Sequence, residues 1–353
     1  MGDIVSKSEF VLNPVTAPEY RCDPITGIWS IIAPERAKRL AIESENRSRC
    51  PFCAGNESLT LPEVFAFRAE KSIANDSNWR VRVIDNLYPA VRLSSTEVCY
   101  QPNDCPDHVR TFGGGCPAQG FHEVIIEGPE HERSFVKLSK NLFREVILSW
   151  KQRLLFYHEK KEIGYVQIFK NHGPEAGASL EHSHSQLIAL SDPPGFIAEE
   201  IRSGKDYYQQ HDRCTWCDWL KKELDLGIRI VAQNHSCVAI SANAARWPFE
   251  TWILPRTHFS HLEFTSEEIF EDFIALTQNV LLGLHHALLD PPYNLVLHSG
   301  PMRCKNLPSF HWHLEILPRL TQPGGFEWAT GRHINPVPPE QAAKFLHRVI
   351  SGE

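Results

Sequence analysis

One ordered set of residues occurs twice along this chain of 353 residues, and it constrains the fold more than any other feature. Each copy contains a Cys-x-x-Cys pair, an apolar segment ending in a histidine, a helical pattern and a His-x-His. The lone histidine precedes the His-x-His by 51 residues in the first copy (His131 to His182) and by 53 in the second (His258 to His311). Such fixed-order similarity indicates gene duplication. We therefore expect two copies of one α+β unit.

The segments between these residues follow the same hydrophobic pattern in both copies. An apolar strand and turn come first, then a helix with apolar residues every three or four positions, and then a short strand. These segments are 121–131, 142–154 and 166–169 in the first copy, and 249–258, 269–284 and 294–297 in the second. Thr265 and Glu268 have the spacing of a capping box at the start of the second helix. The predicted fold is α+β, with tandem domains at 1–195 and 205–353, each an antiparallel sheet with a packed helix.

Composition agrees with two compact domains and excludes several kinds of partner. The chain is 42% hydrophobic and 22% charged, and its net charge is −7. A net negative charge provides no positive electrostatic potential to attract nucleic acid or an anionic membrane, so we expect neither as a partner. The sequence shows no signal peptide and no membrane-spanning stretch. We therefore expect a cytoplasmic protein, whose ten cysteines serve as free thiols or metal ligands.

Four of the cysteines form two close pairs, Cys50 with Cys53 and Cys214 with Cys217. This spacing lets two thiolates bind one tetrahedral metal, usually zinc. Thioredoxin-type redox pairs share the spacing, but they open a helix that follows a strand. The first pair here lies instead in a polar loop. The pattern favours metal binding, with buried free thiols as the alternative.

The duplication supplies two histidines for each cysteine pair. The expected sites are Cys50, Cys53, His131 and His182 in the first copy, and Cys214, Cys217, His258 and His311 in the second. His122 and His261 lie nearby as alternatives to the lone histidines. Four protein ligands leave no open position, which is typical of structural zinc. The sequence therefore predicts two zinc ions per chain, both in structural sites.

The His-x-His of the first copy leads into an apolar strand at 187–190. Residues two apart on a strand share a face, so His182, His184 and Gln186 point the same way. A neutral imidazole is a competent nucleophile near pH 7, because its unperturbed pKa is about 6.5. One histidine can thus be fixed by a metal while the next contacts a ligand.

A loop with two glycines precedes this strand. Gly173 and Gly177 permit close backbone approach, and Ser179 offers a hydroxyl. These features fit a cradle for phosphate oxygens. They fit a glycine-bearing turn beside a metal-bound histidine equally well, and spacing alone does not separate the two interpretations.

The segment 169–186 resembles the active-site signature of the galactose-1-phosphate uridylyltransferase family, a branch of the histidine-triad (HIT) superfamily. That signature reads Phe, an acidic residue, Asn, a basic residue, Gly, three spacers, Gly, four spacers and His-Pro-His-x-Gln. The sequence keeps Phe169, Asn171, Gly173, Gly177, His182, His184 and Gln186 in register, and departs at Lys170, His172 and Ser183, the last being proline in the family. Ser183 and the run Gly324-Gly325-Phe326-Glu327 are closer to a subgroup that includes plant ADP-glucose phosphorylase.

The resemblance implies two HIT-like domains, the first carrying the nucleophile, and a nucleotidyltransferase that acts on nucleoside-diphosphate sugars. His184 would attack the α-phosphorus, release hexose 1-phosphate and carry the nucleotidyl group to a second hexose 1-phosphate or to phosphate, in a ping-pong sequence. Gln186 and Ser179 would stabilise the developing charge. His182 would be a metal ligand that fixes the strand.

The resemblance also implies substrate-binding residues and a homodimer whose subunits share active sites. Asn171 and Gly177 belong to the phosphate loop of the signature. Arg36 and Arg39 resemble an Arg-x-x-Arg that contacts phosphate, although a solvated charge run would look the same. Asn86 is similar to a residue that holds ribose, with an ordinary Asn turn as the alternative. The remaining matches are Gly325, Phe326 and Glu327, the last aligned with a glutamate that binds hexose hydroxyls.

Several functions remain open at this point. Transfer between UDP-glucose and hexose 1-phosphate (galactose 1-phosphate) is the first hypothesis, and ADP-glucose phosphorolysis is the second. Hydrolysis is less favoured, because HIT hydrolases have a third histidine where this chain has Gln186. A zinc-stabilised nucleotide-binding module without catalysis would not need that glutamine or the two glycines. We expect no second active site at His313, because the loop before it lacks the glycine register and Glu315 would repel phosphate.

Overall fold

The structure is a computed structural model that describes residues 17–37, 50–93 and 115–353. The chain divides into two compact units. Unit 1 consists of residues 1–46 and 88–119, and unit 2 consists of residues 47–87 and 120–353. Unit 2 therefore contains the strands, helices and Cys/His groups of both copies of the repeat.

Unit 1 contains a small antiparallel sheet with the strand order β2-β1-β5. Its strands are β1 (Glu19–Cys22), β2 (Trp29–Ile32) and β5 (Gly115–Pro117), and the 3₁₀ helix η1 (Pro34–Arg36) follows β2. The Asp23 carboxylate accepts hydrogen bonds from the Ile25 amide and the Thr26 hydroxyl, which closes the turn between β1 and β2. Gly27 has a φ of 71° in this turn, a conformation that favours glycine.

Unit 2 is built on one ten-stranded sheet with the order β3-β4-β6-β8-β7-β12-β13-β11-β10-β9. Its pairings are antiparallel. The strands are β3 (Glu63–Arg68), β4 (Trp79–Asp85), β6 (Gly120–Ile126), β7 (Tyr165–His172), β8 (His184–Leu190), β9 (Ile230–Gln233), β10 (Cys237–Ser241), β11 (Thr251–Pro255), β12 (Tyr293–His298) and β13 (His313–Pro318). The order is mirrored about the central β7–β12 pair, where Asn171 lies opposite Asn294.

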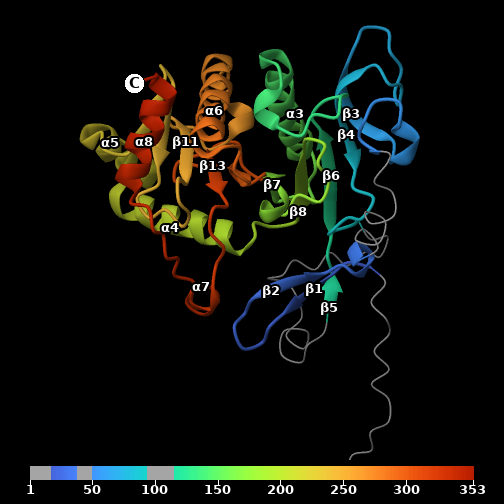
Figure 1. The fold of residues 1–353 in the computed structure, drawn as a ribbon. Coiled ribbons are helices and arrows are strands. Elements are labelled where there is room, and N and C mark those ends of the chain that lie inside the picture. The colour runs from blue at the N-terminus through green and yellow to red at the C-terminus, as the bar shows by residue number, and fades with distance from the viewer. Residues whose placement is uncertain (1–16, 38–49, 94–114) are drawn as a thin grey trace, which may run out of the picture. The chain divides into compact units, whose positions relative to one another are not determined.

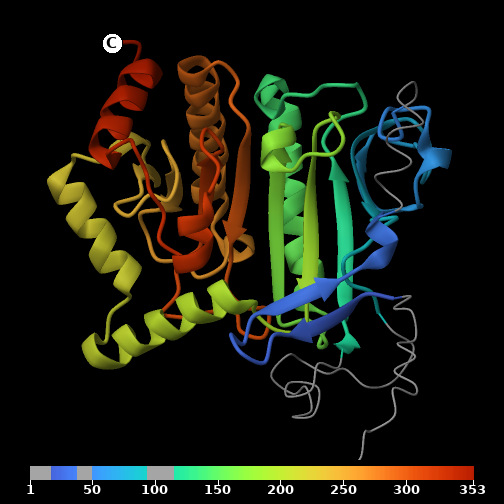
Figure 2. The same ribbon diagram turned by 60° about the horizontal axis from the view of Figure 1, so that its bottom comes forward.

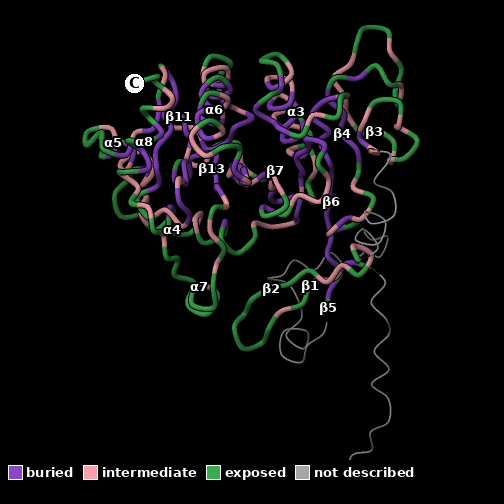
Figure 3. Tube along the Cα trace, viewed as in Figure 1, coloured by how far each residue is buried: buried purple, intermediate pink, exposed green. Residues whose placement is uncertain are grey.

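The two long helices α3 (Lys140–His158) and α6 (Glu267–Leu288) lie side by side on one face of this sheet, and α8 (Pro339–Ser351) lies next to α6 (Figures 1 and 2). The other elements are α4 (Gly195–His211), α5 (Thr215–Leu226), α7 (Gly325–Thr330), η2 (Glu57–Leu59), η3 (Phe135–Lys137), η4 (Pro174–Ala176) and η5 (Leu262–Phe264). One hydrophobic core runs under both long helices. Figure 3 shows strands such as β6 and β13 as largely buried and α7 as largely exposed.

The alternation along β8 assigns its side chains to two different environments. Ser185 accepts a hydrogen bond from the indole of Trp150 on α3 at 3.0 Å, and Leu187 belongs to the core under that helix. His184 and Gln186 therefore point to the opposite face. A smaller hydrophobic cluster of Phe52, Trp79, Ile84, Val124 and Ile126 supports that second face.

The predicted helices and strands are confirmed, and so is the mixed architecture of helices with an antiparallel sheet. The capping box predicted from Thr265 and Glu268 is wrong. Ser266 is the N-cap of α6, and the Thr265 hydroxyl donates instead to the His261 carbonyl at 3.1 Å. Among the described residues, no helix combines the length and apolar character needed to cross a membrane.

The contact between α3 and β6 includes a buried ion pair, which gives a stability prediction. Arg153 donates to Glu123 at 2.9 and 2.5 Å, and both residues are buried. Arg153→Met leaves a buried carboxylate without its cation and should lower the free energy of unfolding by about 3–5 kcal/mol. Arg153→Met/Glu123→Gln should recover most of that loss in urea denaturation. Equal losses in the two variants would contradict the assignment of the cost to the unpaired charge.

Candidate active site

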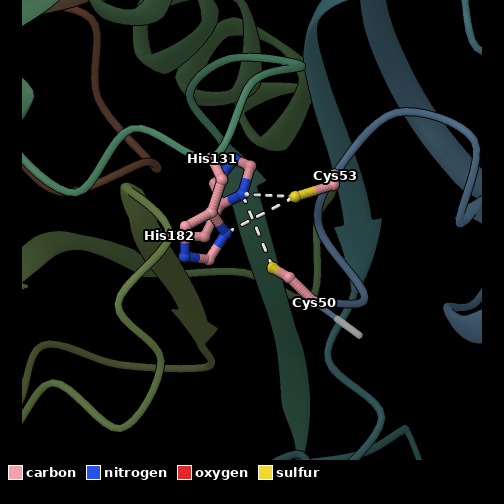
Figure 4. A group of neighbouring side chains, drawn as sticks. All are labelled: Cys50, Cys53, His131 and His182. Carbon is pink, nitrogen blue, oxygen red and sulfur yellow. Dashed lines mark hydrogen bonds between the residues drawn. The ribbon is translucent and has the colours of Figure 1, made fainter. Parts of the chain in front are cut away.

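The first Cys/His group gathers residues from three separate segments (Figure 4). Cys50 and Cys53 precede η2, His131 follows β6, and His182 lies just before β8. The distances from Sγ to Nδ1 are 3.6 Å for Cys50–His182, 3.4 Å for Cys53–His131 and 3.6 Å for Cys53–His182. A tetrahedral zinc ion places its sulfur and nitrogen ligands about 3.5 Å apart, given its usual bond lengths. The group therefore has the dimensions of one tetrahedral site.

The chemistry of these donors also fits a metal cation. Nε2 of His182 donates to the Gly128 carbonyl at 2.9 Å, so the lone pair is on Nδ1, which faces the thiols. Burial lowers the pKa of His182 to about 4, which keeps the ring neutral. Burial and the neighbouring Cys50 raise the pKa of the Cys53 thiol to about 11. A bound cation would stabilise both thiolates at neutral pH, so the donor set is suited to zinc.

The second group repeats this arrangement around the start of α5. Cys214 is the N-cap of that helix and Cys217 lies in its first turn, so this pair does open a helix. The Cys217 sulfur lies 3.4 Å from Nδ1 of His258 and 3.7 Å from Nδ1 of His311. Nε2 of His311 donates to the Pro255 carbonyl at 3.0 Å, as His182 does to Gly128. The structure thus shows two Cys₂His₂ groups, each with its ligand atoms within 4.8 Å of one another.

His184 is the first residue of β8, and a backbone carbonyl fixes the orientation of its ring. Nδ1 lies 2.8 Å from the carbonyl oxygen of His182. A carbonyl oxygen only accepts, so the proton is on Nδ1 and Nε2 carries the lone pair. The Phe52 ring meets the imidazole edge to face, with the ring centroids 5.4 Å apart. The hydrogen bond leaves Nε2 as the ring nitrogen directed away from the His182 carbonyl.

Gln186 belongs to a row of three polar side chains on the same face. Its Oε1 lies 3.0 Å from Nε2 of His122, and that nitrogen lies 3.1 Å from Nδ2 of Asn86. Sequence analysis considered His122 only as an alternative metal ligand and so missed this contact. The contact depends on the register of β6 and β8, in which His122 lies opposite Ile188, two residues from Gln186.

The glycine loop follows β7 and contacts the second copy of the repeat. Gly173 and Gly177 have φ values of 82° and 86°, where a side chain would be strained. Nδ2 of Asn294 donates to Oδ1 of Asn171 and to the Ala176 carbonyl, both at 2.8 Å. Ser179 is half-buried in the same loop. Sequence analysis missed Asn294, which comes from β12 and holds both the loop and its asparagine.

The other predicted substrate-binding residues come from separate parts of the chain. Arg36 lies in unit 1, where its guanidinium donates to the Tyr88 carbonyl at 2.8 Å. Arg39 lies outside the described residues. Gly325, Phe326 and Glu327 form the first turn of α7, and Glu327 accepts a hydrogen bond from the Gly324 amide at 2.9 Å. Both views of unit 2 show α7 beside the second copy and apart from β8 (Figures 1 and 2).

The second His-x-His has the same backbone contact but different surroundings. Nδ1 of His313 lies 3.1 Å from the His311 carbonyl, as in the first copy. The ring centroid of Trp216 lies 4.2 Å from that of His313, and burial lowers the pKa of His313 to about 4. Glu315 takes the place of the glutamine and pairs with Arg246 at 2.6 Å. The ring is enclosed beside a carboxylate, which disfavours phosphate binding there.

Comparisons with known proteins relate the whole chain to sugar-nucleotide enzymes. The family described as galactose-1-phosphate uridyl transferase, N-terminal domain, matches residues 10–194, and a domain of unknown function matches residues 143–351. An ADP-glucose phosphorylase of Arabidopsis thaliana is 35% identical over 94% of this chain and 93% of its own length. A galactose-1-phosphate uridylyltransferase of Haemophilus influenzae is 27% identical over 95% of each chain.

Solved structures give the same relationship. The structure of an ADP-glucose phosphorylase from Arabidopsis thaliana with bound ADP-glucose has a TM-score of 0.71 at 34% identity and covers 94% of this chain and 99% of that chain. A uridylyltransferase structure has a TM-score of 0.77 and covers 95% of this chain and 99% of that chain, and at 24% identity it shows the shared fold alone.

Proposed function

Because the chain belongs to the galactose-1-phosphate uridylyltransferase family, we propose that it is a nucleotidyltransferase acting on nucleoside-diphosphate sugars through a covalent nucleotidyl-His184. The contact between Nδ1 of His184 and the His182 carbonyl at 2.8 Å carries this proposal. It sets the tautomer whose Nε2 can attack phosphorus, and it does so without an added base.

The chemistry follows in two displacements at the α-phosphorus. Nε2 of His184 attacks, the bond from this phosphorus to the bridging oxygen breaks, and hexose 1-phosphate leaves. An oxygen of the acceptor phosphate then attacks the same phosphorus, and the bond to His184 breaks. Oε1 of Gln186 lies 3.0 Å from Nε2 of His122, and the amide nitrogen of Gln186 would donate to a non-bridging oxygen. Ser179, Asn171 and the Gly177 backbone would bind the remaining phosphate oxygens.

We assign one zinc ion to each Cys₂His₂ group. The distances and donor chemistry described above support this assignment, and four protein ligands indicate a structural role. Zinc would supply a cross-link between the loop of Cys50 and Cys53, the turn of His131 and the start of β8. That cross-link ends at His182, two residues before the nucleophile.

We also interpret the two halves of the chain as tandem HIT-like domains, residues 1–195 and 205–353. The mirrored strand order and the repeated Cys₂His₂ groups support a duplication. A cytoplasmic location is part of the proposal. Its support is that the eight cysteines among the described residues are not joined in disulfides, which is typical of a reducing compartment.

Two donors are compatible with the proposal. Transfer between UDP-glucose and hexose 1-phosphate, including galactose 1-phosphate, is the first candidate, and the matching family model and the Haemophilus influenzae relative support it. ADP-glucose phosphorolysis is the second. It is favoured by the 35% identity to the Arabidopsis enzyme and by Ser183 in place of the signature proline.

A homodimer with shared active sites completes the proposal. Phe326 and Trp328 on α7 are 52% and 79% exposed, and α7 lies apart from β8 of its own chain (Figure 1). Exposed aromatic residues of this kind are enriched in interfaces. The α7 segment of one subunit would bring Glu327 to the hexose bound beside His184 of the other.

The donor can be identified from the covalent intermediate. Incubation with UDP-glucose should add about 306 Da to the intact protein, and incubation with ADP-glucose about 329 Da, because the nucleotidyl group stays on the enzyme. His184→Gly should form neither adduct while keeping its fold. An adduct of unchanged yield in His184→Gly would reassign the nucleophile, and absence of both adducts in the unsubstituted protein would contradict the proposed mechanism.

The zinc assignment predicts separable metal losses. Cys50→Ser should lower zinc from about two ions per chain to about one and reduce unfolding free energy by several kcal/mol, because structural zinc binding is folding free energy. Cys22→Ser removes a thiol outside both groups and serves as the matched control. Elemental analysis that finds equal zinc in the two variants would remove the first metal site from this account.

Shared active sites predict complementation between two inactive variants. His184→Gly and Glu327→Ala should each lose transfer alone. After subunit exchange, the mixed dimer contains one site with His184 from one subunit and Glu327 from the other. Activity should therefore return on mixing. Failure to regain activity, with mixed dimers confirmed by native mass spectrometry, would place Glu327 outside the site of the partner.

A further inference from the structure

A buried lysine lies behind the strand that carries His184. Lys170 is on β7 opposite Ser185, so its side chain points to the α3 face, away from the imidazole. Its ammonium group donates to Glu127 at 2.6 Å, to the Ser183 hydroxyl at 3.0 Å and to the His184 carbonyl at 3.0 Å. Lys170 is 1% exposed and Glu127 is inaccessible to solvent. The mechanism described above uses none of these groups.

Placing this charge pair in the core is costly in itself. Removing a lysine and a glutamate from water costs several kcal/mol for each ion, and a packed apolar pair is often as stable. Stability is therefore a weak explanation for the pair. Its position suggests another one, because two of the three hydrogen bonds of the ammonium end on Ser183 and on the backbone of His184 itself.

The backbone at residues 182–184 is fixed from several sides. The Ser183 amide donates to the Glu132 carbonyl at 2.8 Å, and the Glu127 amide donates to the Ser183 carbonyl at 3.2 Å. The Ser183 hydroxyl also contacts the Glu127 carboxylate. The His182 carbonyl that orients the imidazole is joined directly to the Ser183 amide. Any rotation of this segment would therefore reorient the carbonyl that accepts the hydrogen bond from the His184 imidazole.

Two departures from the signature meet in this network. A proline at position 183 would restrict the backbone by its ring. Ser183 lacks that restraint. Its hydroxyl lies 3.0 Å from the ammonium of Lys170, which is the second residue that departs from the signature. Hydrogen bonds from the lysine thus restrain the segment that a proline ring would otherwise restrict.

We propose that Lys170, Glu127 and Ser183 form a positioning network that sets the direction of the His184 imidazole. The inference rests on the proposed function, since it assumes that this ring is the nucleophile. Lys170 touches neither the ring nor the reacting phosphorus, so it is a positioning residue and not a catalytic one. Its loss should lower the rate of covalent transfer and leave donor binding nearly unchanged.

The test removes the pair as a unit. Lys170→Met/Glu127→Gln avoids an unpaired buried charge, and Arg153→Met/Glu123→Gln removes a comparable buried pair on the same face as the matched control. At saturating donor, the first variant should form the adduct about 10- to 100-fold more slowly, which is the scale expected of a misplaced reacting group. The donor concentration that gives half of the maximal rate should change little. The control variant should form the adduct at the rate of the unsubstituted protein. Ser183→Ala retains the ion pair and should show a smaller loss in the same direction.

A second readout does not depend on activity. Nitrogen-15 NMR of histidine-labelled protein, with His184 assigned from the missing signal in His184→Gly, should show one tautomer protonated at Nδ1. In Lys170→Met/Glu127→Gln, the signal should indicate a mixture of tautomers, and in the control pair it should not change.

Unchanged rate and tautomer in the Lys170 variant, or equal changes in the control, would overturn the proposed network. If the unsubstituted protein forms no adduct with either donor, the proposed function fails, and the tautomer comparison still decides whether Lys170 positions the ring.

Discussion

His182 connects the first Cys₂His₂ group to the candidate nucleophile, His184. Its Nδ1 lies 3.6 Å from each sulfur of Cys50 and Cys53, and its carbonyl accepts the hydrogen bond from His184 at 2.8 Å. The ring and the carbonyl belong to one residue, so an ion that fixes the ring also restrains the acceptor. In the proposed mechanism, a zinc ion in this group would be coupled to the chemistry of His184 through this single residue, without touching the substrate.

The side chains of β8 have different roles on the two faces of the sheet. On the α3 face, Ser185 and Leu187 contact the helix and its core, and Lys170 holds the backbone. On the other face, His184 and Gln186 belong to the candidate site. A strand pairing on both edges and packed on both faces has little freedom to move, which suits a nucleophile that must be oriented before the substrate binds.

Much of this arrangement could be predicted from the sequence, because it depends on local periodicity and on a repeated order of residues. Apolar spacing located α3 and α6, and the duplication placed His131 and His258 with their cysteine pairs. Contacts that depend on strand register were not predictable. Alternation assigns His122 or Asn294 to a face but does not say which residue of a distant strand lies beside it. The capping box failed because Ser266, one residue later, has the N-cap position of α6.

The most direct measurement is the location of the nucleotidyl group after rapid quenching of the protein with its donor. Phosphoramidate adducts survive alkali and break down in acid, so peptide mapping under alkaline conditions preserves the site. The account predicts modification of the peptide that carries His184 and of no other histidine. An adduct on His122 or His313, or turnover with no adduct on any residue, would contradict it.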